Sequence, residues 1–363
     1  MVANGCQRFS EPSIRVPGDG LKTGARARET VARSLAAIAL VAVSIAGCER
    51  VQEFLNPAPP DVSGDWTPLL AEVRAFERRI GFRETDNFRN FSGDHVAFPF
   101  CGYVSRFYLP YSYQDTAIQW VESVATEEEC RAAGGDADAY FGFVEALGES
   151  ATPVTPSMVE SKVDRFLYLV IHEDCHDQFD LPFGIEEALC NVITYKAMAA
   201  FSAERYGRFA SANRAVRRYT DTQAQITKAT IGYYGQLAAL YARHERGEIS
   251  SDALLRERSA VFRQAERALA RGDEEMNNVT IANEMTYSRH YPFLESTFEA
   301  LGRDLARTVA FFAQVDQIKP SKAAVMSEHG ITDEYSLNFV RAYEEALVTA
   351  IREALAARKP GQT

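Results

Sequence analysis

The chain has 363 residues, of which 46% are hydrophobic and 25% charged, and this globular composition excludes wholesale disorder, collagen and a protein with many membrane spans. Its formal net charge of −11 argues against a nucleic-acid binder, and six cysteines are too few for a disulfide scaffold. The length suits one large domain or two small ones with a sizeable core.

The first 47 residues have the pattern of a secretory signal peptide. They carry six basic and three acidic side chains, and residues 35–43 form the apolar run LAAIALVAV. That run is too short to span a bilayer, which takes about 20 apolar residues, and small residues follow it, as in a signal peptide. Removal of residues 1–47 would leave 33 of the 39 basic and 47 of the 50 acidic side chains, a net charge of −14.

The ending Ile-Ala-Gly-Cys at residues 45–48 resembles the box of bacterial lipoproteins, in which the cysteine becomes the lipidated first residue. The resemblance implies that Cys48 anchors the protein to a membrane of the bacterial cell envelope; a plain signal peptide or an N-terminal anchor helix is the alternative. Glu49 stands where an aspartate would favour the inner membrane, so the periplasmic face of the outer membrane is expected. Residues 48–65 are predicted to be a tether, because three prolines fall within 57–60.

Residues 66–150 are predicted to form an N-terminal part with both helix and strand. Residues 66–80 have apolar side chains at helical spacing. Residues 91–113 are rich in aromatic side chains, which is typical of strands or extended loops. A loop is expected at Gly134, Gly135 and the Asp/Ala segment that follows them.

Residues 151–320 are predicted to form a helical body. Its first helix begins at Pro156, after the N-cap Thr155, and reaches about Phe179. A C-terminal helix is expected within 321–363, over about 334–358. The fold class is therefore mainly α, with a small β-containing part (α+β). Apolar spacing places the intervening helices at about 185–205, 212–244, 250–271, 279–289 and 293–313.

The sequence HEDCH, from His172 to His176, fits the zinc-peptidase pattern His-Glu-x-x-His. On a helix the two histidines lie one turn apart on one face, where both can bind one Zn²⁺. Glu173 follows the first histidine and is placed to take a proton from a metal-activated water and to pass it to the leaving amine. The alternative is a chance match on an amphipathic helix, but the apolar run FLYLVI before the motif favours a buried metal-binding helix.

A hydrolytic zinc site has three protein ligands and one open position. No histidine lies between His176 and His244, so the candidates for the third ligand are Glu186 and Glu187 at the start of the next helix. A short return through 181–184 allows that helix to present a carboxylate to the two imidazoles. The residues alone leave the choice between the two glutamates open.

Two cysteines accompany these ligands. Cys175 lies inside the motif, and Cys190 lies three residues after Glu187. Because an exported protein works in an oxidising compartment, a disulfide between them would join the two ligand-bearing helices; two buried thiols are the alternative. Cys101 and Cys130 are a second candidate pair.

The segment after residue 276 offers candidates for substrate contacts. Tyr287 is a candidate to donate a hydrogen bond to the oxyanion that forms in peptide hydrolysis, with core packing as its alternative. His290 is a weaker candidate for the same role. Asn277 and Asn278 are candidates to hold a substrate backbone, or equally to cap a helix.

Three segments resemble a family of bacterial lipoproteins described as putative aminopeptidases, within the gluzincin metallopeptidases. They are AFPFCGYVSRFY at 97–108, YLVIHEDCHDQ with the nearby GIEEALCNVIT, and 277–312 with its Asn-Asn pair. The resemblance implies a gluzincin-like catalytic body with Glu173 as the base and His172, His176 and Glu187 as the zinc ligands. This sequence departs from the family in a shorter spacing before the third ligand and in a cysteine at position 175, where a small apolar residue is usual.

Together these features predict a membrane-tethered zinc metallopeptidase with peptide substrates and Zn²⁺ as cofactor, and the resemblance implies aminopeptidase activity. The competing hypothesis is a non-catalytic envelope lipoprotein that binds peptides or a partner protein. In that hypothesis the metal, if retained, is only structural.

Overall fold

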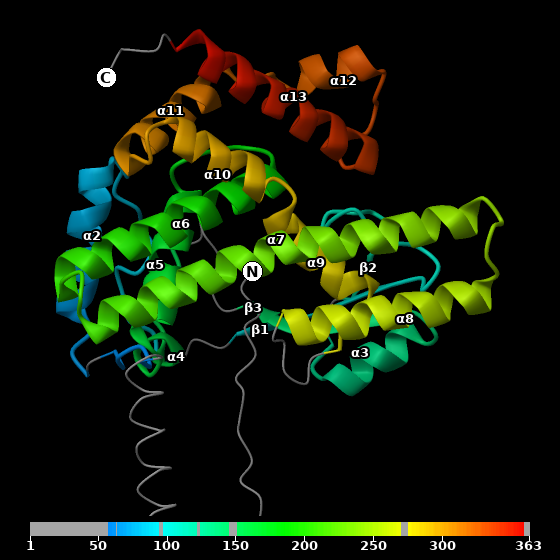
Figure 1. The fold of residues 1–363 in the computed structure, drawn as a ribbon, viewed down its shortest axis with the longest axis horizontal. Helices are drawn as coiled ribbons and strands as arrows, with labels where there is room; N and C mark the ends of the chain where they lie inside the picture. Colours follow the sequence, from blue (N-terminus) through cyan, green and yellow to red (C-terminus); the bar gives the residue numbers. More distant parts are fainter. Residues whose placement is uncertain are drawn as a thin grey trace, which may run out of the picture.

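Helices dominate the structure, as the sequence predicts (Figure 1). The computed structural model describes residues 57–62, 64–93, 97–121, 124–144, 151–269 and 275–358. Its helices are α2 (Thr67–Ile80), α3 (Glu127–Gly134), α4 (Pro156–Val159), α5 (Val163–His176), α6 (Phe183–Tyr206), α7 (Ser211–Glu245), α8 (Ser251–Ala268), α9 (Asn278–Ser288), α10 (Tyr291–Ala300), α11 (Leu305–Ile318), α12 (Lys322–His329) and α13 (Leu337–Ala357).

The described residues contain one three-stranded antiparallel sheet. Its strands are β1 (Phe98–Val104), β2 (Gln119–Val121) and β3 (Asp138–Val144), in the spatial order β2-β1-β3. Helix α3 packs against β1 and β3, and the Cys101–Cys130 disulfide joins β1 to α3. Helix α9 also packs against β1 and β3. The fold class predicted from the sequence, mainly α with a small β-containing part, is therefore confirmed.

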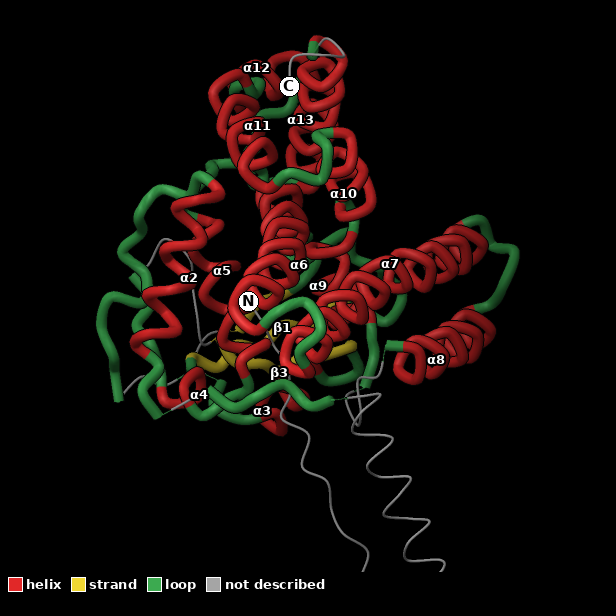
Figure 2. The backbone as a smooth tube through the Cα atoms, turned by 60° about the vertical axis from the view of Figure 1, so that its left-hand side comes forward, coloured by secondary structure: helices red, strands yellow, loops and turns green. Residues whose placement is uncertain are grey.

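Helices α5 and α6 form the centre of the structure, and α7 packs along α6 (Figure 1). Every residue of α5 except Arg165 is buried, which is expected of a helix that is covered by neighbours on all faces. Helices α7 and α8 form an arm that projects to one side, while α11, α12 and α13 gather at another end of the molecule (Figure 2). None of the described helices is both long and apolar enough to cross a membrane.

The helix predicted from Pro156 to about Phe179 is wrong, because the structure contains two helices there, α4 and α5. The break is caused by the segment before α2. The Val62 amide donates to the Ser161 carbonyl at 3.0 Å, and the Val163 amide donates to the Pro60 carbonyl at 2.8 Å. This pairing holds the chain extended between the helices, and it depends on residues about 100 positions apart, beyond the reach of local periodicity.

The single helix expected at 293–313 is also two helices, α10 and α11. Gly302 and Arg303 take the left-handed conformation, with φ of 84° and 58°, and this ends α10. Asp304 then caps α11 by accepting a hydrogen bond from the Arg307 amide at 2.9 Å. Helix α12 was not predicted, and it precedes the expected C-terminal helix α13.

The loop expected around Gly134 and Gly135 is only partly correct. Gly134 ends helix α3, and the Asp/Ala segment leads directly into strand β3. The start of α3 has a recognisable signal, since Thr126 and Glu129 form a capping box. The helix expected at 66–80 is present as α2. Cys48 and the residues before it lie outside the described part of the chain.

Candidate metal centre

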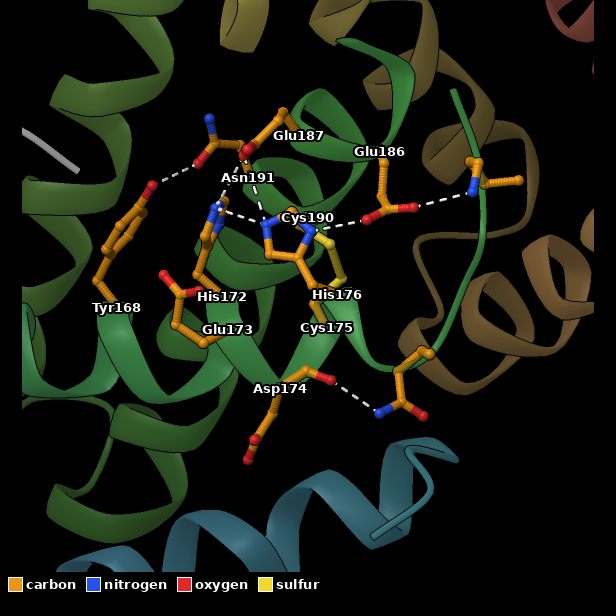
Figure 3. Close-up of a disulfide and its surroundings, with 12 residues drawn as sticks. Tyr168, His172, Glu173, Asp174, Cys175, His176, Glu186, Glu187, Cys190 and Asn191 are labelled. Carbon is orange, nitrogen blue, oxygen red and sulfur yellow. Dashed lines mark hydrogen bonds and ion pairs between the residues drawn. A yellow bond between two sulfur atoms is a disulfide. The ribbon is translucent and has the colours of Figure 1, made fainter. Parts of the chain in front are cut away.

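Helices α5 and α6 bring His172, His176 and Glu187 together (Figure 3). Glu187 Oε2 lies 3.2 Å from His172 Nε2 and 3.5 Å from His176 Nε2. The two imidazole Nε2 atoms are 3.3 Å apart. Each of the three residues offers one ligand atom, these atoms lie within 4.8 Å of one another, and all three residues are buried. This cluster has the donor set and the convergence that a metal ion requires.

Glu186 contacts the same site in a different way. Its Oε1 accepts a hydrogen bond from His176 Nδ1 at 2.8 Å, and its Oε2 accepts one from the Leu181 amide at 2.9 Å. A carboxylate on the far nitrogen of a metal-binding histidine fixes the tautomer and the orientation of that ring. The geometry therefore favours Glu187 as the ligand and gives Glu186 the role of orienting His176.

The charges in this cluster are strongly coupled. Burial opposes charge on His176, but the charge of Glu187 and hydrogen bonds with Glu186 and Glu187 outweigh it and raise the pKa of His176 well above its usual value. Burial likewise opposes charge on Glu187, yet the charge of His176 and hydrogen bonds from both histidines lower its pKa well below its usual value. A cation bound at these three side chains would compete with a proton on His176, because metal ligands must be deprotonated.

Glu173 and Tyr287 lie beside this cluster. The Oε1 atom of Glu173 is buried and has no hydrogen-bond partner among the described residues. Burial and then the charges of Glu187 and Glu173 raise the pKa of Tyr287 well above its usual value, so this hydroxyl keeps its proton at neutral pH. The Tyr287 side chain is only partly buried. The charges of Glu187 and Glu173 thus act on the Tyr287 hydroxyl.

Sequence reasoning missed the residues that support the ligands. The Tyr168 ring stacks on the His172 ring with centroids 5.0 Å apart, and its hydroxyl donates to Asn191 Oδ1 at 2.8 Å. Tyr168 lies one turn before His172, and Asn191 lies one turn after Glu187. The four-residue spacing was the available signal, because it places each residue on the same helix face as a ligand.

A second missed contact lies on the opposite side of the motif. Asp174 accepts a hydrogen bond from Thr85 Oγ1 at 2.5 Å and lies 3.6 Å from Arg74 of α2. Burial and the charge of Asp174 raise the pKa of Glu77, also on α2, well above its usual value. These buried groups attach α5 to α2, and no local sequence pattern connects the two segments.

The Cys175–Cys190 disulfide is present and joins α5 to α6 directly beside the ligands (Figure 3). Cys175 is the neighbour of His176, and both sulfur-bearing residues are fully buried. Because one ligand pair lies on α5 and the third ligand lies on α6, this bond limits how far the two helices can separate.

Removal of this disulfide, with Cys175→Ala and Cys190→Ala together, is expected to lower both stability and metal affinity. The bond closes a loop with a sequence separation of 15, for which about 3 kcal/mol of unfolding free energy is typical. Denaturant unfolding measures the first effect and zinc titration the second. The matched control is Cys101→Ala with Cys130→Ala, which removes a bond away from the ligands and should lower stability alone. Unchanged zinc affinity in the first variant would contradict this role.

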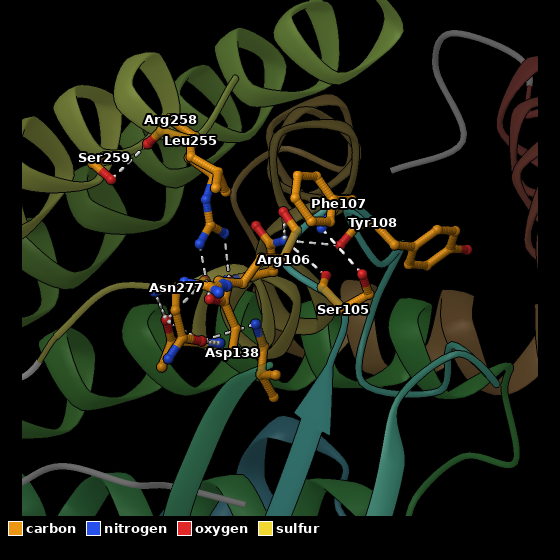
Figure 4. Close-up of polar contacts among 12 residues, drawn as sticks. Ser105, Arg106, Phe107, Tyr108, Asp138, Leu255, Arg258, Ser259 and Asn277 are labelled. Carbon is orange, nitrogen blue, oxygen red and sulfur yellow. Dashed lines mark hydrogen bonds and ion pairs between the residues drawn. The ribbon is translucent and has the colours of Figure 1, made fainter. Parts of the chain in front are cut away.

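Both asparagines of the pair make hydrogen bonds within the fold. The Asn277 side chain caps α9 by accepting hydrogen bonds from the Val279 and Thr280 amides (Figure 4). Asn278 is fully buried, and its side-chain amide Nδ2 donates a hydrogen bond to the Tyr108 carbonyl at 2.8 Å. These positions favour the capping alternative for Asn277 and give Asn278 a structural contact in place of the suggested substrate contact.

His290 contacts a carboxylate of the C-terminal helix α13. Its Nε2 lies 2.9 Å from Glu344 Oε2, and the Tyr111 hydroxyl donates to the same oxygen at 2.7 Å. Glu344 belongs to α13, and a Cβ atom added at Gly184 would lie 2.5 Å from its Oε1. His290 thus pairs with a buried carboxylate that packs against the first turn of α6, which favours a positioning role over substrate contact.

Comparison with known proteins identifies a family for this chain. A family described as "Putative aminopeptidase" matches residues 89–326, which is more than half of the chain. The chain belongs to this aminopeptidase family. Membership indicates peptidase function and a peptide substrate. The matched segment contains all three candidate ligands, Glu173 and Tyr287, whereas α2 and α13 lie outside it. Searches of curated proteins and of solved structures each found no significant match.

Proposed function

We propose that this member of the aminopeptidase family is a zinc metallopeptidase of the gluzincin type. The observation that carries the proposal is the convergence of His172, His176 and Glu187 within 4.8 Å. Two imidazoles and one carboxylate are a donor set that catalytic zinc sites use, and three protein ligands leave a fourth position for water or substrate. The buried Oε1 of Glu173 has no hydrogen-bond partner among the described residues. This agrees with a base that would accept a proton from a water molecule at the fourth position.

Zinc at this site would lower the pKa of a coordinated water towards 7 and polarise the peptide carbonyl. Glu173 would accept the proton as the nucleophile attacks and later deliver it to the nitrogen of the leaving amine. Tyr287, which keeps its hydroxyl proton, would donate a hydrogen bond to the oxyanion that develops on the carbonyl oxygen. Glu186 would hold His176 with Nε2 directed towards the metal.

The proposal includes attachment to the bacterial cell envelope through a lipid on Cys48, with the outer membrane as the expected location. The support is the sequence pattern at residues 35–48. An oxidising envelope compartment also agrees with the two disulfides of the described residues.

The different roles of Glu186 and Glu187 give an expected difference in metal affinity. Glu187→Gln should lose a charged ligand and with it most zinc binding. Glu186→Gln should weaken zinc binding by about 10–100-fold, since it changes only the partner of His176. Zinc titration of both variants, with circular dichroism to verify folding, measures the difference. Greater loss in Glu186→Gln than in Glu187→Gln would reverse the assignment.

A further inference from the structure

A row of partly exposed aromatic rings begins at the metal centre. Phe183 is the first residue of α6 and lies one turn before Glu187, so both face the same side of the helix. The Tyr113 ring lies 6.4 Å from the Phe183 ring and 4.3 Å from the Trp120 ring of β2. The Tyr113 amide also donates to Thr286 Oγ1 at 3.0 Å, immediately before Tyr287. The row therefore begins on the side of α6 that carries Glu187 and beside Thr286, the residue before Tyr287.

The rings continue across one face of the sheet. Phe100 of β1 lies 6.0 Å from Trp120 and 5.6 Å from Tyr140 of β3, measured between ring centroids. Phe98 lies two residues before Phe100, and side chains two apart on a strand share a face. We call the set Phe98, Phe100, Tyr113, Trp120, Tyr140 and Phe183 the aromatic ledge.

Two glycines allow the ledge to lie flat on the sheet. Gly102 pairs with Trp120 on one side, and Gly142 pairs with Phe100. A Cβ atom at Gly102 would lie 2.5 Å from Trp120 Cζ3, and one at Gly142 would lie 2.7 Å from Phe100 Cζ. The rings of Trp120 and Phe100 thus cover the glycine backbone directly.

The ledge is more exposed than an ordinary core surface. Phe98 is 63% exposed and Trp120 is 37% exposed, while the other ledge residues are intermediate. At its opposite end the same sheet face is closed, because Val104 packs against Val279 and Ala282 of α9. Contiguous apolar surface that remains open beside a polar site is typical of a ligand-binding surface. None of the six side chains carries a charge at neutral pH, so the surface favours an apolar ligand over a charged one.

We propose that the aromatic ledge binds an aromatic or large aliphatic side chain of the peptide, next to the bond that is cut. This proposal rests on the proposed peptidase function and extends it to a substrate class, namely hydrophobic peptides. A substrate whose scissile carbonyl lies between Glu187 and Tyr287 places a neighbouring side chain where the row of rings begins. Burial of that side chain against Tyr113 and Trp120 would hold the peptide in register at the metal.

The kinetic test uses two matched peptide series, one that varies the residue before the cut bond and one that varies the residue after it. The varied residue is Phe, Leu, Ala or Lys. In one of the two series, wild-type kcat/KM for the Phe or Leu peptide should exceed that for the Ala peptide by about tenfold or more. Trp120→Ala should remove most of this preference by lowering kcat/KM for the Phe and Leu peptides towards that for the Ala peptide. Gly102→Ala should act in the same direction by displacing the Trp120 ring. Phe209→Ala, at an 87% exposed position before α7, is the control and should keep the preference.

A binding test separates failure of this inference from failure of the peptidase proposal. The sequence contains two tryptophans, so Trp66→Phe leaves Trp120 as the sole reporter. In that background, a Phe-containing peptide should change the Trp120 emission at lower concentration than an Ala-containing one, whether or not it is cleaved. A response to peptide without any cleavage would support the ledge and count against the peptidase proposal. Cleavage without preference, or an emission change with phospholipid vesicles but not with peptides, would overturn the ledge as a peptide-binding surface.

Discussion

Replacement of Glu173 by glutamine is expected to abolish peptide hydrolysis while zinc remains bound. Glutamine has nearly the same shape as glutamate but accepts no proton at neutral pH, so general acid–base catalysis is lost, typically about 10²–10⁴-fold in rate. The ligands His172, His176 and Glu187 are unchanged, so one metal ion per chain should remain. Hydrolysis of a peptide library and elemental analysis of the same protein sample measure the two properties together.

The matched control for this variant is Glu328→Gln. Glu328 is exposed on α12, outside the family segment, and its replacement should leave both activity and zinc content at wild-type levels. If Glu173→Gln cleaved peptides at the wild-type rate, the assignment of Glu173 as the base would be wrong. If neither protein cleaved any peptide although both bound zinc, the non-catalytic lipoprotein hypothesis would be favoured.

Replacement of His172 by alanine is expected to remove zinc and its contribution to stability. His172 is fully buried and lies 3.2 Å from Glu187 Oε2. A ligand that binds only the folded state stabilises it by about 4 kcal/mol when its free concentration is a thousandfold above Kd. Added zinc should therefore raise the Tm of the wild-type protein and leave the Tm of the variant unchanged. Thermal unfolding with and without zinc is the measurement.

The control for the metal experiment is His329→Ala, at the exposed end of α12. This variant should show the full wild-type increase in Tm with zinc. His172→Asn keeps a polar side chain in the same place and provides a second variant if the alanine protein folds poorly. An equal increase in Tm for His172→Asn and wild type would exclude His172 as a ligand.

The centre of the site was predictable because its signals are local. His172, Glu173 and His176 lie within one helical turn, and both candidates for the third ligand follow a short return. The residues alone did not separate Glu186 from Glu187. Adjacent residues on a helix point in different directions, and the sequence does not say which of the two directions faces the histidines of α5. The distances to both histidines and the contact of Glu186 with His176 Nδ1 supply that information.

The parts that the sequence did not predict depend on contacts between distant segments. The break between α4 and α5 comes from pairing with residues 60–62, and the contact of His290 with Glu344 joins α10 to α13. The aromatic residues of 91–113 indicated strand or extended loop, and among the described residues of this segment Phe98–Val104 form the strand. Strand pairing with β2 and β3 decided which residues did so, and such pairing is set by tertiary context as much as by propensity.

Zinc titration of the metal-free wild-type protein, with peptide hydrolysis followed at each step, measures whether this aminopeptidase family member cleaves peptides with zinc held by His172, His176 and Glu187. We expect no hydrolysis without metal, a rise in proportion to added zinc, and saturation at one zinc per chain. Hydrolysis that is independent of zinc would show that the proposed zinc chemistry is wrong, as would full binding of one zinc per chain without cleavage of any peptide.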